Sequence, residues 1–389
     1  MALQPPAVGS FRLVCAAVPM LGCGPSAQNP DASASVDATE DPSPTGSDQD
    51  AVTSTTSTTG DPIDSSGDST TDAPAVWPEE ELVALFEGDS HRLEAHSLEI
   101  TRSRVHVGSR WGTAESFRWT IDRATHDTVA TSPVGGPLVS TSAFIYTSGY
   151  VNGSLLDDWA VVRFGHDGTG EELLATSSDG FFMAASAPDE SFFVARGPFL
   201  YTEEMWRISD KSDVPSAVGF LGEQAGFPFA YASGRLFLQD LSATGIVELE
   251  TKTGTLTPLL PLDSSFFQLA ARDDLLFVGT EDAVLRVDLD SRTTEALAEH
   301  GRVQALETAE SATYWVTART EMQFERLFML PLGASEPSEI PLDQDAKVSA
   351  GYGPITSVAA TSTEIFILRT AANHEFDHAG SLWRLPFPE

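Results

Sequence analysis

The sequence predicts an all-β fold, a seven-bladed β-propeller with four antiparallel strands in each blade. The first observation is a strand motif that recurs seven times. It reads an apolar position, a variable and often charged one, a second apolar one, and then usually Asp, Pro, Ser or Glu. Successive copies are 43, 44, 41, 38, 43 and 55 residues apart, a spacing typical of four-stranded blades. The copies begin at Trp119, Val162, Trp206, Val247, Leu285, Phe328 and Trp383.

A second motif runs in phase, 7 to 16 residues ahead of the first, and predicts an adjacent antiparallel strand joined to it by a loop. Its copies end at Val107, Tyr146, Val194, Leu238, Val278, Val316 and Ile367. Segments of small and apolar residues lie upstream and suit a crowded inner strand, as in Phe182–Ala185, Leu269–Ala271 and Val358–Ala360. Downstream segments such as Glu172–Ala175 and Glu295–Ala298 suit the outer strand. We label the four strands A to D from the central channel outward.

Ring closure is the third observation, because a propeller that does not join its last blade to its first leaves open sheet edges. After the seventh motif copy only Phe387–Glu389 remain, too few for an outer strand. Glu80–Phe86 precede the first inner strand and resemble the other outer strands in composition. We therefore expect this N-terminal strand to complete the last blade. We count seven blades, with six as the main competing count.

Two segments resemble bacterial propellers of the TolB type and similar lipoprotein propellers. Ala187–Val194 is similar to that family's Ser-Pro-Asp-Gly turn leading into a strand, and Leu382–Leu385 is similar to its terminal strand. Only one blade keeps the Pro-Asp turn. The resemblance covers residues 79–389 as a repeat style, and it implies the propeller fold without a partner or a function.

The composition changes sharply ahead of the propeller. From Pro25 to Pro78 the chain consists mostly of Ser, Thr, Asp, Pro and Gly, with almost no large apolar side chains. Such a stretch cannot bury enough surface to offset the entropy lost on ordering. We expect residues 24–78 to form a disordered linker and residues 79–389 to form the propeller.

The first residues indicate export. Leu13–Leu21 is an apolar stretch after Arg12, too short for a transmembrane helix but typical of a secretory signal peptide. Met20–Cys23 resembles the bacterial lipobox, which implies a signal peptide over 1–23 and lipidation of Cys23. Met20 stands where Leu is usual, and an ordinary cysteine in a plain signal peptide is the alternative. The resemblance implies a lipid-anchored protein of the bacterial cell envelope, at the outer membrane, cell surface or periplasm.

Charge and cysteine content narrow the partners. The chain has 57 acidic and 22 basic residues, a net charge of −35, which repels phosphate backbones and predicts no nucleic-acid partner. Anionic lipid is repelled too, so membrane attachment would come through the acyl anchor alone. The two cysteines, Cys15 and Cys23, lie in the targeting segment, which leaves the mature domain without a disulfide. We expect a monomer that binds a protein or a glycan.

Catalytic signatures are weak. His374–His378 matches the zinc-protease pattern His-Glu-x-x-His, which works on a helix, whereas here it falls in the B–C loop of blade seven. His374 and His378 are therefore only weak metal candidates. The Asp pairs lack the spacing of a calcium loop, and no nucleophile motif is present. We predict no catalytic residue and no cofactor, with a hydrolase or lyase at the channel mouth as the alternative.

One asymmetry points to binding. The offset between the B and C motifs is 12 or 16 residues in blades six, seven, one, two and three, but 9 and 7 in blades four and five. The longer loops share one face, and aromatic and Arg side chains on loops over a rigid scaffold are typical of recognition surfaces. We therefore expect a non-catalytic binding module. The predicted binding residues are Arg110, Trp111, Tyr150, Tyr201, Arg319, Phe324, His374 and Phe376.

Overall fold

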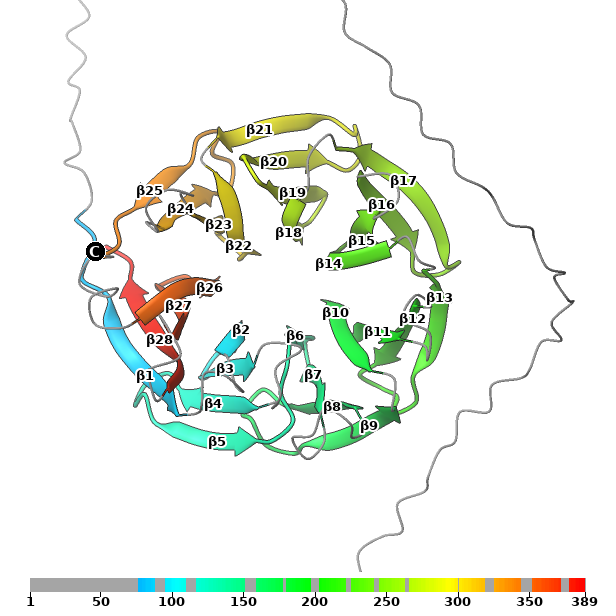
Figure 1. The fold of residues 1–389 in the computed structure, drawn as a ribbon, viewed down its shortest axis with the longest axis horizontal. Helices are drawn as coiled ribbons and strands as arrows, with labels where there is room; N and C mark the ends of the chain where they lie inside the picture. Colours follow the sequence, from blue (N-terminus) through cyan, green and yellow to red (C-terminus); the bar gives the residue numbers. More distant parts are fainter. Residues whose placement is uncertain are drawn as a thin grey trace, which may run out of the picture. The chain divides into compact units, whose positions relative to one another are not determined.

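The computed structural model describes residues 76–87, 95–109, 117–150, 159–177, 180–196, 203–221, 225–240, 245–262, 266–299, 301–318, 325–343, 352–371 and 378–388. The chain divides into two compact units, Met1–Thr70 and Thr71–Glu389, and every described residue lies in the second. These residues form seven four-stranded antiparallel sheets in a ring (Figure 1). The predicted seven-bladed propeller is confirmed, and the competing count of six is wrong. The described residues contain no helix that is long and apolar enough to span a bilayer.

In each blade the sheet order follows the chain from the channel outward, apart from the last. Blade one is β2 (Ala95–Ile100), β3 (Arg104–Ser109), β4 (Arg118–Asp122) and β5 (Thr128–Ser132). Blade two is β6 (Leu138–Ser140), β7 (Phe144–Tyr150), β8 (Trp159–Gly165) and β9 (Glu172–Ser177). Blade three is β10 (Phe181–Ala187), β11 (Glu190–Arg196), β12 (Glu203–Ser209) and β13 (Ser216–Phe220). Blade four is β14 (Ala225–Ala232), β15 (Arg235–Asp240), β16 (Gly245–Glu250) and β17 (Thr255–Pro261).

The remaining blades bring the chain back to its start. Blade five is β18 (Phe266–Arg272), β19 (Leu275–Thr280), β20 (Ala283–Asp288) and β21 (Thr294–Glu299). Blade six is β22 (Arg302–Thr308), β23 (Ala312–Ala318), β24 (Glu325–Pro331) and β25 (Ser338–Ile340). Blade seven is β26 (Tyr352–Ala360), β27 (Glu364–Ala371) and β28 (His378–Pro386), with β1 (Glu81–Glu87) as its outer strand.

Closure by the N-terminal strand is therefore confirmed. β1 runs antiparallel to β28, with Leu85 opposite Ser381 and Phe86 opposite Gly380. Phe86 is buried and its ring lies 4.7 Å from that of Trp119 in blade one, so β1 also contributes to the core between the last and first blades. The strand supplies both an edge and apolar side chains that the last blade lacks on its own.

A buried ion cluster fastens the segment just ahead of β1. Arg369 of β27 is fully buried, with Nη1 3.3 Å from Glu325 Oε2 and Nη2 4.0 Å from Glu80 Oε2. Burial lowers the pKa of Arg369 and raises that of Glu325 to about 7. The backbone N–H of Ile355 donates to Glu325 Oε1 at 2.7 Å, and that of Asp343 donates to Glu80 Oε1 at 3.3 Å. The cluster joins blades six and seven to the N-terminal segment.

The recurring strand-C motif has a physical basis at its turn residue. Asp122 Oδ1 accepts hydrogen bonds from the backbone N–H groups of Ala124 and Thr125, at 2.8 and 3.0 Å. Asp288 Oδ1 accepts in the same way from Asp290 and Ser291. These bonds stabilise the C–D turn and lower the pKa of both aspartates.

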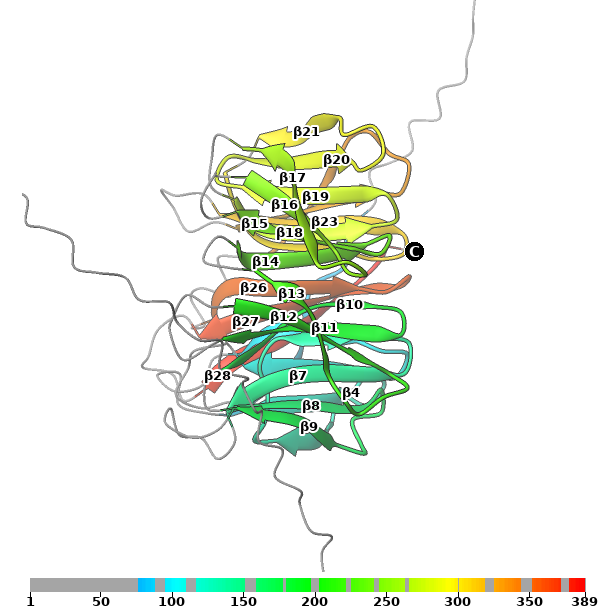
Figure 2. The same cartoon turned by 90° about the vertical axis from the view of Figure 1, so that its right-hand side faces the viewer.

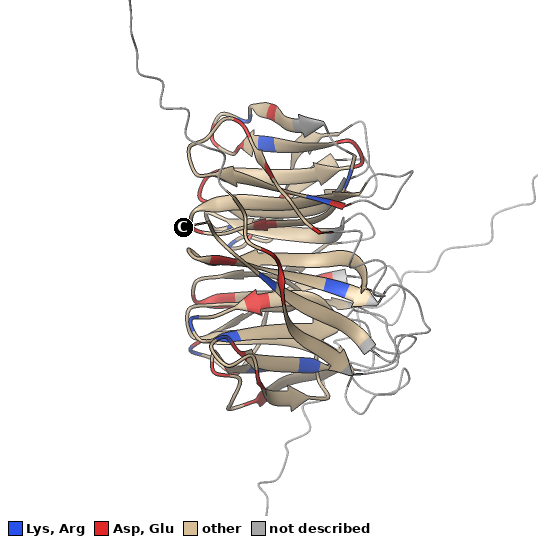
Figure 3. Ribbon diagram, turned by 90° about the vertical axis from the view of Figure 1, so that its left-hand side faces the viewer, with Lys and Arg blue, Asp and Glu red and all other residues tan. Residues whose placement is uncertain are grey.

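The variable position of the same motif carries cross-strand ion pairs. Arg163 pairs with Glu172 on the neighbouring outer strand at 2.8 Å, Arg286 pairs with Glu295, and Arg384 Nη1 lies 3.2 Å from Glu81. Each pair joins direct neighbours in the strand register, where opposite charges are favourable. Figure 3 shows both signs of charge on the side of the ring that it views, among the described residues.

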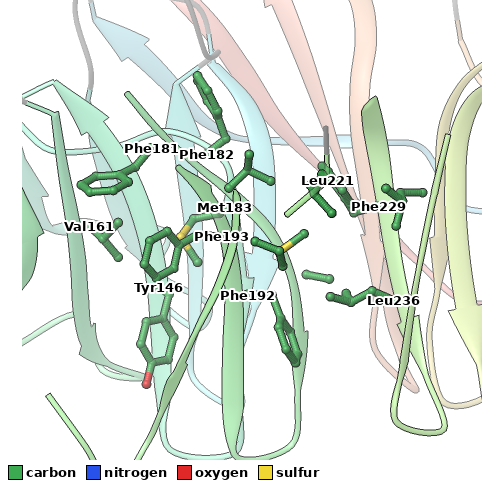
Figure 4. Packing of buried hydrophobic residues seen from close by; sticks show 14 of the residues in the cluster. Tyr146, Val161, Phe181, Phe182, Met183, Phe192, Phe193, Leu221, Phe229 and Leu236 are labelled. Carbon is green, nitrogen blue, oxygen red and sulfur yellow. The ribbon is translucent and has the colours of Figure 1, made fainter. Parts of the chain in front are cut away.

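The core lies between the blades and is rich in aromatic side chains. Five strand-B aromatic residues are at most 1% exposed: Phe193, Phe237, Phe277, Trp315 and Phe366. Around blade three, Phe181 meets Phe193 edge-on at 5.4 Å (Figure 4). Phe192 stacks on Tyr231 of blade four, with the ring centroids 5.5 Å apart. Polar ties add to this packing, because Tyr146 of blade two donates to Asp210 Oδ1 of blade three at 2.8 Å. Neighbouring blades are therefore held rigidly.

Candidate functional site

The rim at the B–C ends of the blades is unequal, as the sequence predicts. The connections between strands B and C span 110–117, 151–158, 197–202, 319–324 and 372–377 in blades one, two, three, six and seven. In blades four and five they span only 241–244 and 281–282. Since all blades share one topology, the ends of these strands meet at one rim, and the A–B and C–D turns lie at the other (Figure 2).

Most predicted rim residues fall outside the described part of the chain. These are Arg110, Trp111, Tyr201, Arg319, Phe324, His374 and Phe376, and the lipidation candidate Cys23 falls outside it as well. His378 is the first residue of β28, but its side chain is also outside that part. Their roles stay predictions.

Tyr150 is the exception, and it lies at the end of β7. Its side chain is 8% exposed, and its ring lies 4.0 Å from that of Trp159. Trp159 in turn meets Phe182 edge-on at 5.3 Å, so Tyr150 belongs to the packing between blades two and three. Its position supports the rim, and its predicted contact with a partner remains untested.

The central channel forms a second candidate site, which no residue named from the sequence marks. All seven inner strands line it, and it forms an open space of about 350 Å³. Six of these strands carry a register irregularity against strand B, with β6 as the exception. Such a bulge adds a residue and re-aims side chains. In β2 and β10 the extra residues, His96 and Ala184, face the channel.

Two glutamates dominate the chemistry of the channel. Glu99 is the penultimate residue of β2 and Glu307 that of β22, the strands that flank β26 in the ring (Figure 1). Both therefore lie toward the A–B turns, away from the B–C rim. Glu99 is half-buried and Glu307 is exposed to the channel.

Enclosure shifts the titration of this pair. The surrounding protein displaces part of the water around both carboxyls, which raises the pKa of Glu99 to about 7 and that of Glu307 to about 8. Repulsion from Glu99 adds to the rise at Glu307. Water inside the channel limits the size of the effect at the accessible Glu307, but protein on every side fixes its direction toward the neutral acid.

Hydrogen-bond donors of the channel wall are mostly committed to the wall itself. Ser97 Oγ donates to Gly136 O at 2.9 Å, Thr308 Oγ1 to Ala271 O at 3.0 Å, and Gln268 Nε2 to Gln304 O at 3.0 Å. Ser140 Oγ donates to Glu99 Oε2 at 2.8 Å. The interior is left rich in acceptors. Within the described residues no group of three or more His, Cys, Asp or Glu side chains could hold a metal ion.

Sequence reasoning named neither glutamate, although it considered a hydrolase or lyase site at the channel mouth. The available signal was an acidic residue at the same place in two inner strands, Leu98-Glu99 and Leu306-Glu307, where small and apolar residues prevail. Which of these side chains faces the channel depends on the bulges, and these have no clear sequence signature.

The ring is similar to propellers of known structure at low sequence identity. The β-propeller domain of the Trilobed protease from Pyrococcus furiosus has a TM-score of 0.52 and 8% identity, covering 76% of this chain and 94% of that one. This chain is a seven-bladed β-propeller. The acylaminoacyl peptidase of Pyrococcus horikoshii has a TM-score of 0.54 and 8% identity, covering 77% of this propeller chain and 52% of the peptidase.

A third propeller, TolB from Acinetobacter baumannii, has a TM-score of 0.42 and 7% identity, covering 74% of this chain and 78% of that one. A likeness this low supports no argument about function. No protein-family model and no curated protein matches the chain. The similarities show the propeller fold alone, and the function has to be argued from the sites.

Proposed function

We propose that this propeller is a non-catalytic binding module that holds a protein or glycan at its B–C rim. The observation that carries the proposal is the run of longer B–C connections through blades six, seven, one, two and three. The connection 281–282 shows that two residues suffice to join these strands. Each longer loop costs more closure entropy, so five contiguous ones need a cause beyond folding.

The scaffold suits such a role. Strands β3, β7, β11, β23 and β27 end at this rim and are anchored by buried aromatic or aliphatic side chains, among them Phe193, Trp315 and Phe366. Loops on a rigid base lose less freedom on binding than loops on a mobile one. We further propose that the propeller is exported and anchored through Cys23, with residues 24–78 as a linker. The order of apolar stretch, Gly-Cys and polar linker in the sequence supports this.

The test compares rim variants with variants at the opposite face. Full-length protein would be immobilised and exposed to an envelope extract of the source organism and to a glycan array. Trp111→Ala and Tyr201→Ala are expected to reduce capture of the bound partner by about tenfold, the scale of an interface hot spot. Thr253→Ala and Thr293→Ala, at exposed positions in C–D turns, are the matched controls and should leave capture unchanged. Loss of capture in the controls but not in the rim variants would place the function at the other face.

A hydrolase or lyase acting in the channel is the second candidate. The raised pKa values of Glu99 and Glu307 favour it, because a carboxylic acid that stays protonated near neutral pH can act as a general acid. Turnover of ester, glycoside or uronate substrates that disappears in Glu307→Gln would establish this candidate in place of the binding module.

A further inference from the structure

We propose that the central channel binds a primary ammonium or guanidinium group, carried by a small diamine or by a Lys or Arg side chain of a partner chain. This site lies inside the ring toward the A–B turns. It does not depend on the binding surface proposed at the B–C rim.

The first step is the space. The channel forms an open space of about 350 Å³, and the seven inner strands surround it. This lies at the lower end of the range of about 300 to 1,000 Å³ that small-molecule sites occupy. It is also far more than the ~30 Å³ that one water takes in liquid. A linear amine or one long cationic side chain fits a space of this size.

The second step is the charge. The two buried glutamates elsewhere in the described part of the ring have arginine partners: Glu364 pairs with Arg123 and Arg384, and Glu325 pairs with Arg369. Glu99 and Glu307 form no ion pair with any described Lys, Arg or His. They repel one another instead. A cationic ligand would supply the positive charge that these two glutamates lack among the described residues.

The third step is hydrogen bonding. The side chains of Ser97, Gln268 and Thr308 donate to backbone carbonyls of the wall, which leaves the two carboxylates as the strong acceptors of the interior. An ammonium group offers three donors and a guanidinium five. Bonds from such groups to carboxylates are about twice as strong as neutral ones.

The protonation of the channel glutamates should change when a cation binds. The ionisable side chains that face it in the described residues are His96, Glu99, Tyr231 and Glu307. Burial raises the pKa values of both glutamates and of Tyr231, so the empty channel carries protons on its acids near neutral pH. A bound cation stabilises the carboxylates and displaces these protons. Binding should therefore strengthen as the pH rises from 6 to 8.

The experiment uses isothermal titration calorimetry on the full-length protein at pH 8. The probes are butane-1,4-diamine, the peptide acetyl-Gly-Lys-Gly-amide, butane-1,4-diol and calcium chloride. We expect the diamine, the peptide or both to bind, with proton release and no binding of the diol. Glu99→Gln and Glu307→Gln should each weaken binding by about tenfold or more, as expected for loss of a bond to a charged group. Glu310→Gln is the matched control, because Glu310 is an exposed acid in the A–B turn that follows β22.

The probes also separate the two sources of the cation. Binding of the diamine alone indicates a free amine as ligand, and binding of the peptide alone or of both indicates a side chain of a partner. The proposal is overturned if neither amine binds, if calcium alone binds, or if the diol binds as well as the diamine. Unchanged affinity in a folded Glu99→Gln/Glu307→Gln variant overturns it too. Trp111→Ala should not affect these titrations. A failure of the channel proposal can therefore be told apart from a failure of the binding surface proposed at the B–C rim.

Discussion

Glu81 and Arg384 face each other across β1 and β28, with Oε2 and Nη1 3.2 Å apart, although 303 positions separate them in the chain. Arg384 also pairs with Glu364 of β27, so one arginine ties three strands of blade seven together. The pairing shows that the ring is closed by an N-terminal strand that completes the C-terminal blade. It also identifies β1 as the strand on which closure depends.

Removing the closing strand should destabilise the whole domain. Deletion of Glu79 to Gly88 exposes the edge of β28 and removes the buried Val83 and Phe86, whose burial alone contributes about 3 to 6 kcal/mol. Deletion of Pro25 to Asp72 serves as the control, because no described residue lies in it. Thermal melts should show a large loss in the first variant and almost none in the second. Equal melting temperatures would contradict a closing role for β1.

Breaking the buried ion cluster should also be costly. Among the described residues, Glu325→Gln leaves Arg369 with the more distant Glu80 for charge compensation, and Arg369→Met leaves two buried acids together. Removal of one partner from such a cluster costs about 3 to 5 kcal/mol. Urea unfolding should show this loss in each single variant, and a smaller one when Glu80→Gln, Glu325→Gln and Arg369→Met are combined. A triple variant less stable than the single ones would disprove the mutual compensation.

His106 predicts a pH dependence with a definite sign. The buried ring bridges Thr120 Oγ1 and the carbonyl of His166, and burial lowers the pKa of His106 from 6.5 to about 4. The unfolded chain therefore binds a proton that the folded state excludes between these values. Stability should fall as the pH drops from 6.5 to about 4, by on the order of 3 kcal/mol.

The measurement is urea unfolding of wild type and His106→Gln across this pH range. The variant should lose most of the slope, whatever its stability at pH 7. His126→Gln, at a position outside the core, is the control and should keep the slope. A slope that persists in His106→Gln would assign the effect to other groups.

Lipidation at Cys23 can be tested directly. Expressed in a bacterium with lipoprotein-processing enzymes, the protein should incorporate labelled palmitate and sediment with membranes. Cys23→Ala should abolish both, whereas Cys15→Ala, a change within the signal segment, should preserve them. Palmitate labelling of Cys23→Ala equal to that of wild type would exclude the anchor.

The repeat made the blades predictable because its period reflects a fixed sum of strand and turn lengths. The turn aspartates are an example, since Asp122 and Asp288 recur where a side chain must accept bonds from the C–D turn. Closure was predictable for a related reason, as β1 has the composition of an outer strand. These signals are local, and each blade repeats them.

The channel site was not predictable, because it depends on geometry that varies by one residue. The register shift between Ala95 and Ser97 decides which side chains of β2 face the channel. Proximity of Glu99 to Glu307 further requires the ring that places β2 and β22 on either side of β26. Tyr150 shows the converse error, since a residue expected on a loop proved to be a buried strand end.

Ring closure also bears on how the chain folds. Blades one to six form from strands that follow one another directly, whereas blade seven is complete only when β28 pairs with β1 from the other end of the domain. The rate of folding falls as contacts become more distant in sequence, so this pairing is expected to be slow. The ring centroids of Trp77 and Phe387 lie 5.8 Å apart, so a short linker is enough to join the two ends of the domain. In a circular permutant cut between β21 and β22, every sheet would arise from consecutive hairpins. The native contacts would be the same, and the slow step of closing the ring through β1 would instead fall between two complete blades.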